Sequence, residues 1–93
     1  VDGVILAAAN VLPEAAAGLV QAARAGDVLA VRRQGELLRR VSDSVGRHGI
    51  AGWKAGLAAR GQSGGLARLP LRNLSDSERQ QVTAWTDELV GAL

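Results

Sequence analysis

The sequence predicts a mainly α-helical chain, with one N-terminal strand followed by about four helices. The strand prediction rests on residues 4–9, an apolar run with no polar side chain before Asn10. Parallel strands that are covered on both faces have such unbroken apolar runs. The helices are predicted by apolar residues three and four positions apart and by the capping residues between them. Because the rest of the sequence contains no second strand of this quality, we expect residues 4–9 to be the last strand of a larger sheet.

The first helix is expected over residues 13–25. Pro13 suits its first position, because the missing N–H of proline would have no helical partner there. Gly26 suits the position that ends this helix, and Asp27 suits the N-cap of the next one. We expect one face of the first helix to carry Ala16, Leu19, Val20 and Ala23.

Two further helices are expected over residues 28–48 and 50–60. The longer helix has an apolar stripe of Val31, Leu37, Leu38, Val41 and Val45. The arginines on its other face are interpreted as solvent-exposed charges. The shorter helix has Ile50, Trp53 and Leu57 on one side. Its Gly52 and Gly56 each cost about 1 kcal/mol of helix propensity relative to alanine, so we expect a neighbouring backbone to approach closely there.

The last helix is expected after an extended segment over residues 66–74. Pro70 disfavours a helix at the residue before it, and the leucines of the segment are expected to hold it across the helices. Ser75 and Glu78 have the spacing of a capping box, in which each side chain binds the backbone N–H of the other residue. The helix that follows has an apolar stripe of Val82, Trp85, Leu89 and Leu93.

Size and composition exclude several classes of protein. Ninety-three residues form one small domain at most. The net charge is only +2 and the arginines are spread among acidic residues, so we expect no nucleic-acid partner. No apolar stretch reaches the about 18 residues of a membrane span, and there is no cysteine and no signal-peptide pattern, so we expect a cytoplasmic protein that does not bind a membrane. Because the chain begins at Val1 and contains no methionine, it is interpreted as a piece of a longer protein.

Four short motifs resemble one enzyme family and occur in the order of that family. They are Asp-Gly-Val-Ile with Ala-Asn-Val-Leu-Pro at residues 2–5 and 9–13, Gly-Asp at 26–27, Trp-Lys-Ala at 53–55, and Arg-Leu-Pro-Leu with Leu-Ser at 68–71 and 74–75. Together they resemble the dihydrodipicolinate synthase / N-acetylneuraminate lyase family over nearly the whole chain. The resemblance implies the C-terminal part of a (β/α)8 TIM barrel. Residues 1–25 would then be the last barrel strand and its helix, and residues 26–93 a C-terminal helical extension.

The resemblance also implies a lyase or aldolase that forms a Schiff base with pyruvate or a related keto acid. In this family the imine forms on a lysine of strand six, and a tyrosine of strand five relays protons. This chain contains no tyrosine, and its one lysine, Lys54, matches a lysine of a helix outside the barrel core. We therefore predict no catalytic residue and no cofactor in this chain, and we expect the 93-residue piece alone to be inactive.

Asn10 is the one candidate substrate-binding residue. Ligands of (β/α)8 barrels bind at the C-terminal ends of the strands, and Asn10 follows the predicted strand. Its amide can both donate and accept hydrogen bonds. The alternative is that this amide caps the backbone of the corner between strand and helix. The sole histidine, His48, has no second ligand for a metal and is expected to interact with the carbonyls of a helix end, so no metal site is predicted.

Two hypotheses about function follow. The first is the C-terminal part of such a lyase, whose partners are the remainder of the barrel or another copy of the chain, with the keto acid bound only in the complete enzyme. The second is a stand-alone helical protein-interaction module, whose stripes pair with partner helices. Helices that should cover a barrel would expose apolar surface in the isolated chain. We therefore expect a homo-oligomer, with residues 4–9 paired to another chain, disordered or absorbed into a helix.

Overall fold

The computed structural model of the chain describes residue 3 and residues 6–62 and 72–93. This part contains five α-helices and one 3-10 helix: α1 (Ala8–Val11), α2 (Pro13–Ala25), α3 (Val28–Ser44), η1 (Val45–His48), α4 (Gly49–Ala59) and α5 (Asp76–Gly91). The prediction of a mainly helical chain is confirmed. No helix in this part is long and apolar enough to cross a membrane.

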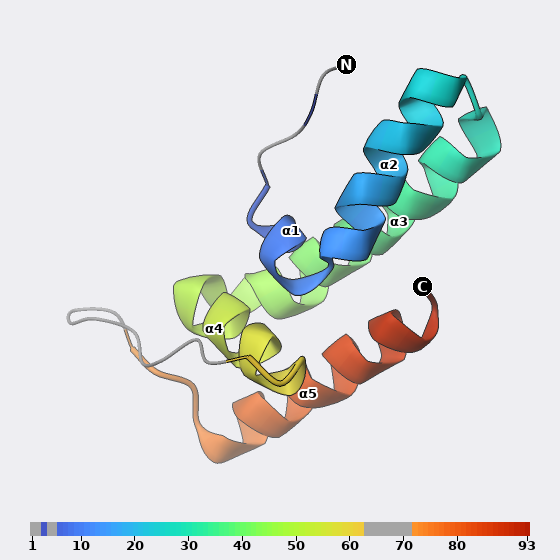
Figure 1. Ribbon diagram of the computed structural model, residues 1–93. Coiled ribbons are helices and arrows are strands. Elements are labelled where there is room, and N and C mark those ends of the chain that lie inside the picture. Colours follow the sequence, from blue (N-terminus) through green and yellow to red (C-terminus); the bar gives the residue numbers. More distant parts are fainter. Residues whose placement is uncertain (1–2, 4–5, 63–71) are drawn as a thin grey trace.

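The longer helices form two pairs: α2 and α3 form a helical hairpin, and α4 and α5 pack against each other. Helices α2 and α3 lie side by side and run in opposite directions, η1 turns the chain into α4, and α5 crosses below α4 (Figure 1). The short helix α1 contacts α2, α3 and α4 where these parts meet. The core lies at this meeting point, and its fully buried side chains include Val11, Leu12, Val41, Val45 and Val82.

The predicted strand is wrong where the structure describes it. Ala8 and Ala9 belong to α1, while residues 4 and 5 lie outside the described residues. A strand needs a neighbouring strand to bond its backbone N–H and C=O groups, and the described part of the chain contains none. These groups bond locally instead: the N–H of Ala9 donates to the Leu6 carbonyl at 3.2 Å, and the N–H of Asn10 donates to the Ala7 carbonyl at 3.1 Å. Alanine also has the highest helix propensity, so this stretch forms a helical turn.

Helix α2 confirms the predicted bounds and the predicted junction with α3. Gly26 has a φ of 72°, in the left-handed region that favours glycine, and the Asp27 carboxylate accepts a hydrogen bond from the N–H of Ala30 at 3.1 Å. On the apolar face expected from the sequence, Ala16 is buried, Leu19 and Val20 are half-buried and Ala23 is exposed. The residues of α2 that are buried are Ala15, Ala16 and Ala22.

Helix α3 ends earlier than predicted, at Ser44, and the chain tightens into the 3-10 helix η1. The Ser44 hydroxyl donates to the Arg40 carbonyl at 2.7 Å, a contact that often bends helices. Gly49 then begins α4 with a φ of 66°, a conformation that glycine adopts without strain. Four of the five predicted stripe residues are buried: Leu37, Leu38, Val41 and Val45.

The predicted close approach of a backbone is confirmed at Gly52 of α4, whereas the neighbours of Gly56 are side chains. A Cβ atom on Gly52 would lie 2.2 Å from the Val45 carbonyl oxygen, and one on Gly56 would lie 2.9 Å from Cγ2 of Val11. Position 52 therefore requires glycine in this packing, and a Cβ atom on Gly56 would force the Val11 side chain to shift. Of the three apolar residues expected on one side of this helix, Ile50 is 52% exposed.

Helix α5 begins with the predicted capping box. The Glu78 N–H donates to Ser75 Oγ at 3.2 Å, and the Ser75 N–H donates to Glu78 Oε1 at 2.9 Å. Val82 and Leu89 are buried as predicted, whereas Leu93 is exposed. Of the predicted extended segment, only residues 72–74 lie in the described part, and Leu74 is buried there.

Candidate functional site

The corner between α1 and α2 carries the one predicted substrate-binding residue. Asn10 is exposed near the end of α1, and no side chain caps either helix at this corner. Within the described residues its side-chain amide has no hydrogen-bond partner, so the capping alternative has no support there. An exposed amide of this kind can bind a carboxylate or hydroxyl oxygen of a ligand. The role of Asn10 in binding substrate stays a prediction.

A clamp formed by Arg60 holds this corner. Arg60 follows α4, and its Nη1 donates to the Val11 carbonyl at 3.0 Å and to Glu14 Oε1 at 3.1 Å. Its Nη2 donates to Glu14 Oε2. These hydrogen bonds lower the pKa of Glu14 and raise the pKa of Arg60. The guanidinium therefore joins the end of α1 to the first turn of α2, with both charges retained at neutral pH.

This clamp was not predicted from the sequence. Arg60 lies 49 residues after Val11 and 46 residues after Glu14. Spacing along the chain carries no signal for such a contact, because it depends on how α4 folds back onto α1. The two glycines of α4 indicate only that some backbone lies close, not which one.

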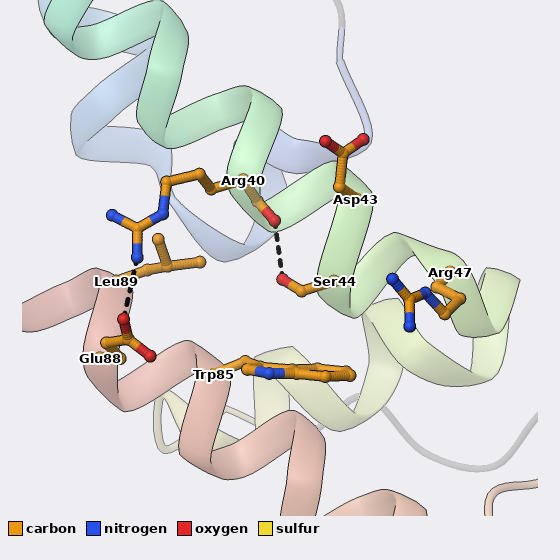
Figure 2. Close-up of a pocket in the computed structure, with 7 residues that line it drawn as sticks. All are labelled: Arg40, Asp43, Ser44, Arg47, Trp85, Glu88 and Leu89. Carbon is orange, nitrogen blue, oxygen red and sulfur yellow. Dashed lines mark hydrogen bonds and ion pairs between the residues drawn. The ribbon is translucent and has the colours of Figure 1, made fainter.

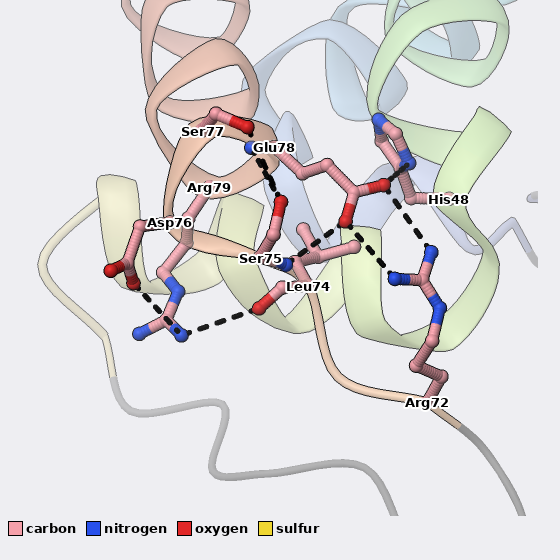
Figure 3. A network of polar contacts seen from close by, with 8 residues as sticks. All are labelled: His48, Arg72, Leu74, Ser75, Asp76, Ser77, Glu78 and Arg79. Carbon is pink, nitrogen blue, oxygen red and sulfur yellow. Dashed lines mark hydrogen bonds and ion pairs between the residues drawn. The ribbon is translucent and has the colours of Figure 1, made fainter.

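A second polar cluster surrounds the start of α5 (Figure 3). The Glu78 carboxylate accepts the Ser75 N–H, lies 3.4 Å from both Nη atoms of Arg72 and lies 3.5 Å from Nδ1 of His48. The Ser75 N–H is the main cause that lowers the pKa of Glu78 to about 2, followed by the Ser75 hydroxyl and Arg72. A carboxyl group with this pKa stays ionised at neutral pH and cannot serve as a general acid there.

His48 of η1 contacts α5 through two residues, Glu78 and Trp85. Its ring stacks on Trp85, with 6.2 Å between the ring centroids, and its Nδ1 faces Glu78 rather than the helix-end carbonyls that the sequence suggested. Its Nε2 is buried without a hydrogen-bond partner in the described part of the chain. In that part no three histidine, aspartate or glutamate residues lie close enough to hold a metal ion.

A groove of about 340 Å³ separates α3 and η1 from α5 (Figure 2). Arg40 and Glu88 bridge it at 2.9 Å, and the Arg47 guanidinium lies 5.9 Å from the centroid of the Trp85 ring. The groove is also lined by Asp43. The carboxylate of this residue accepts a hydrogen bond at 2.7 Å from Arg39, which does not line the groove. The Ser44 hydroxyl donates to a backbone carbonyl and so is not held by a base. The groove therefore contains ion pairs rather than a nucleophile with its general base.

Lys54 lies in α4 and is half-buried. It belongs neither to the Arg60 clamp nor to the residues that line the groove. The described residues thus include a corner between α1 and α2 with one exposed amide, and two networks of ion pairs, one around Arg60 and one around Glu78. The arrangement can position a ligand through Asn10 and can hold helices together.

Comparisons with known proteins identify related sequences. The family model described as "Dihydrodipicolinate synthetase family" matches residues 1–89. Two curated proteins of Halobacterium salinarum, from strains R1 and NRC-1, each carry the description "Uncharacterized DapA-like lyase" and are 37% identical to this chain over 83 residues. The match covers 88% of this chain and 27% of each relative, so the chain spans about a quarter of the length of these relatives. No solved structure matches the chain significantly.

Proposed function

The chain belongs to the dihydrodipicolinate synthetase family, and from this premise we propose that it is the C-terminal part of a Schiff-base-forming lyase or aldolase. The complete enzyme acts on pyruvate or a related keto acid in the cytoplasm. The observation that carries the proposal is the family match, which extends over residues 1–89 and therefore over nearly the whole chain. The description of the two relatives as lyases supports it.

In this proposal the chain has a structural and positioning role. Its corner at Ala8–Val11 lies at the substrate end of the barrel, where Asn10 contacts the keto acid, and α2 to α5 support the barrel. The imine forms on a lysine outside this segment, since Lys54 is the chain's one lysine and lies on a helix. With no tyrosine and no imine-forming lysine, the 93-residue chain alone is inactive.

The proposed partners are the remainder of the barrel or a second copy of this chain. Large apolar side chains are exposed in the described part of the structure: Leu6, Val28, Leu29, Ile50 and Leu93. Leu29 is the most exposed of them, at 77%. Val28 and Leu29 are adjacent at the start of α3 and offer a neighbouring segment an apolar contact there.

One observation favours the alternative, a stand-alone helical protein-interaction module. The described helices enclose a core of their own, in which Val11, Val41 and Val82 are fully buried without any barrel present. A module of this kind binds partner helices and forms no imine.

Borohydride trapping with pyruvate tests the proposed function. In the complete lyase we expect a reduced pyruvate adduct on a lysine outside this segment, and none on the 93-residue chain. Replacing Lys54 by arginine is the matched control and is expected to leave trapping in the complete lyase unchanged. An adduct on Lys54, or no adduct anywhere in the complete lyase, would contradict the proposal.

A further inference from the structure

Helix α4 holds the residue after Asn10 in two ways. Gly56 lies against the Val11 side chain so closely that a Cβ atom there would be 2.9 Å from Val11 Cγ2. One helical turn later, Arg60 donates to the Val11 carbonyl at 3.0 Å. The Val11 side chain is fully buried. Both the side chain and the backbone of Val11 are therefore held by the same face of one helix.

The same guanidinium also holds the beginning of α2. Glu14 lies in the first turn of α2, and its two carboxylate oxygens accept from the two Nη atoms of Arg60. Such two-point contacts fix the direction of approach as well as the distance. The Arg60 side chain is 22% exposed and that of Glu14 is 49% exposed, so solvent reaches the pair mainly from the Glu14 side. The corner from Val11 to Glu14 is consequently fixed relative to α4.

Asn10 immediately precedes this fixed corner. Its own side chain is exposed and has no partner in the described residues that would orient it. Arg60 therefore helps to fix where the Asn10 side chain leaves the backbone, while a bound ligand has to select the rotamer of its amide. We propose that Arg60 is a positioning residue, which presents Asn10 to the keto-acid substrate by clamping the corner between α1 and α2. This inference rests on the proposed function, in which Asn10 contacts the substrate.

Steady-state kinetics of the complete lyase test the inference. Arg60→Met removes every hydrogen-bond donor of the clamp. The methionine side chain is unbranched and replaces the aliphatic part of arginine. The largest expected loss is the one hydrogen bond between the Asn10 amide and the keto acid. We therefore expect the KM for the keto acid to rise about 3- to 10-fold. The value of kcat is expected to change by less than about twofold, since the contact is made equally before and during the reaction.

Two variants show whether the clamp geometry matters. Arg60→Lys keeps the charge but has one nitrogen instead of the guanidinium fork, so it is expected to raise KM by less than Arg60→Met does. Glu14→Gln keeps an acceptor for Arg60 and leaves the contact to the Val11 carbonyl, so its effect is expected to be smaller still. If Arg60→Met does not fold, these two variants carry the test with the same KM criterion.

Arg40→Met is the matched control. Arg40 also joins two elements through a glutamate, pairing with Glu88 of α5 at 2.9 Å, but it bonds to neither α1 nor α2. Its loss is expected to lower Tm and to leave KM unchanged. Asn10→Ala is the reference for the substrate contact itself and is expected to raise KM at least as much as Arg60→Met.

The outcomes separate this inference from the proposed function. A rise in KM for Arg60→Met and Asn10→Ala but not for Arg40→Met supports the inference. If Arg60→Met lowers Tm without raising KM while Asn10→Ala does raise KM, the inference is overturned and the proposed function stands. If no imine forms with a keto acid in the unaltered lyase, the proposed function is overturned and the inference with it.

Discussion

The Glu78 carboxylate joins the start of α5 to the segment before it and to η1. It accepts the Ser75 N–H at 2.9 Å and lies within 3.5 Å of Arg72 and His48. The Ser75 N–H favours the ionised form most, and the pKa of Glu78 falls from 4.5 to about 2. A carboxyl group whose pKa is lower in the folded state stabilises the fold above its unfolded pKa.

Glu78→Gln therefore changes how stability depends on pH. In the unaltered chain the contribution of Glu78 is complete above about pH 4.5 and is lost as the pH falls toward about 2. Glutamine still accepts the Ser75 N–H in a capping box but has no charge to lose. Urea unfolding between pH 2 and pH 7 is expected to show a smaller loss of unfolding free energy in acid for the variant. Parallel curves for the two chains would contradict this account.

The polar contacts differ in how far the sequence alone predicts them. Ser75 and Glu78 are three residues apart, and this spacing is the recognised pattern of a capping box, so the contact was predicted correctly. Glu14 and Arg60 are 46 residues apart, and no local pattern relates them. Asn10 was selected for its place after an apolar run, and the structure places it at an exposed corner without testing its role.

The junction of η1 and α4 depends on a glycine at position 52. A Cβ atom there would lie 2.2 Å from the Val45 carbonyl oxygen, which belongs to the backbone and cannot rotate away. Gly35 of α3 is a matched helical glycine, because a Cβ atom added to it would meet no other atom within 4 Å. The two glycines share the same helix propensity, so a comparison between them isolates the packing effect.

Gly52→Ala is expected to destabilise the chain by about 1–3 kcal/mol, because overpacking outweighs the gain in helix propensity. Gly35→Ala is expected to stabilise it by up to about 1 kcal/mol, since only the propensity changes. Urea unfolding of both variants measures the difference. Equal stabilisation by the two substitutions would show that α4 does not approach η1 as closely as described.

Helices with local signals were predicted best. Pro13, Gly26 and Asp27 mark the bounds of α2 and the start of α3, and the structure has them as predicted. The strand over residues 4–9 was wrong in its described part, because an apolar run does not specify its own hydrogen-bond partners. In the described part no second strand is present, and alanine residues form a helical turn instead.

At the scale of the whole molecule, a helical core coexists with exposed apolar side chains. Val11, Val41 and Val82 are fully buried where the helices meet, whereas Leu29 and Val28 are exposed at the far end of the α2–α3 hairpin. The chain belongs to the dihydrodipicolinate synthetase family and spans about a quarter of the length of its curated relatives. The sequence motifs predicted this family, but the barrel itself stays a prediction.

Fragment complementation tests most directly whether this chain completes a barrel lyase. The DapA-like lyase of Halobacterium salinarum is expressed without the segment that matches this chain and is mixed with the 93-residue chain. The relative's own excised segment is the positive control, and the Arg60→Met chain tests the clamp in the same assay. The intact relative is first assayed for imine formation with pyruvate, and we then predict that the one-to-one complex forms the same imine. If the relative's own segment restores imine formation while this chain stays helical, separate and without effect, the account is contradicted and the interaction module is favoured.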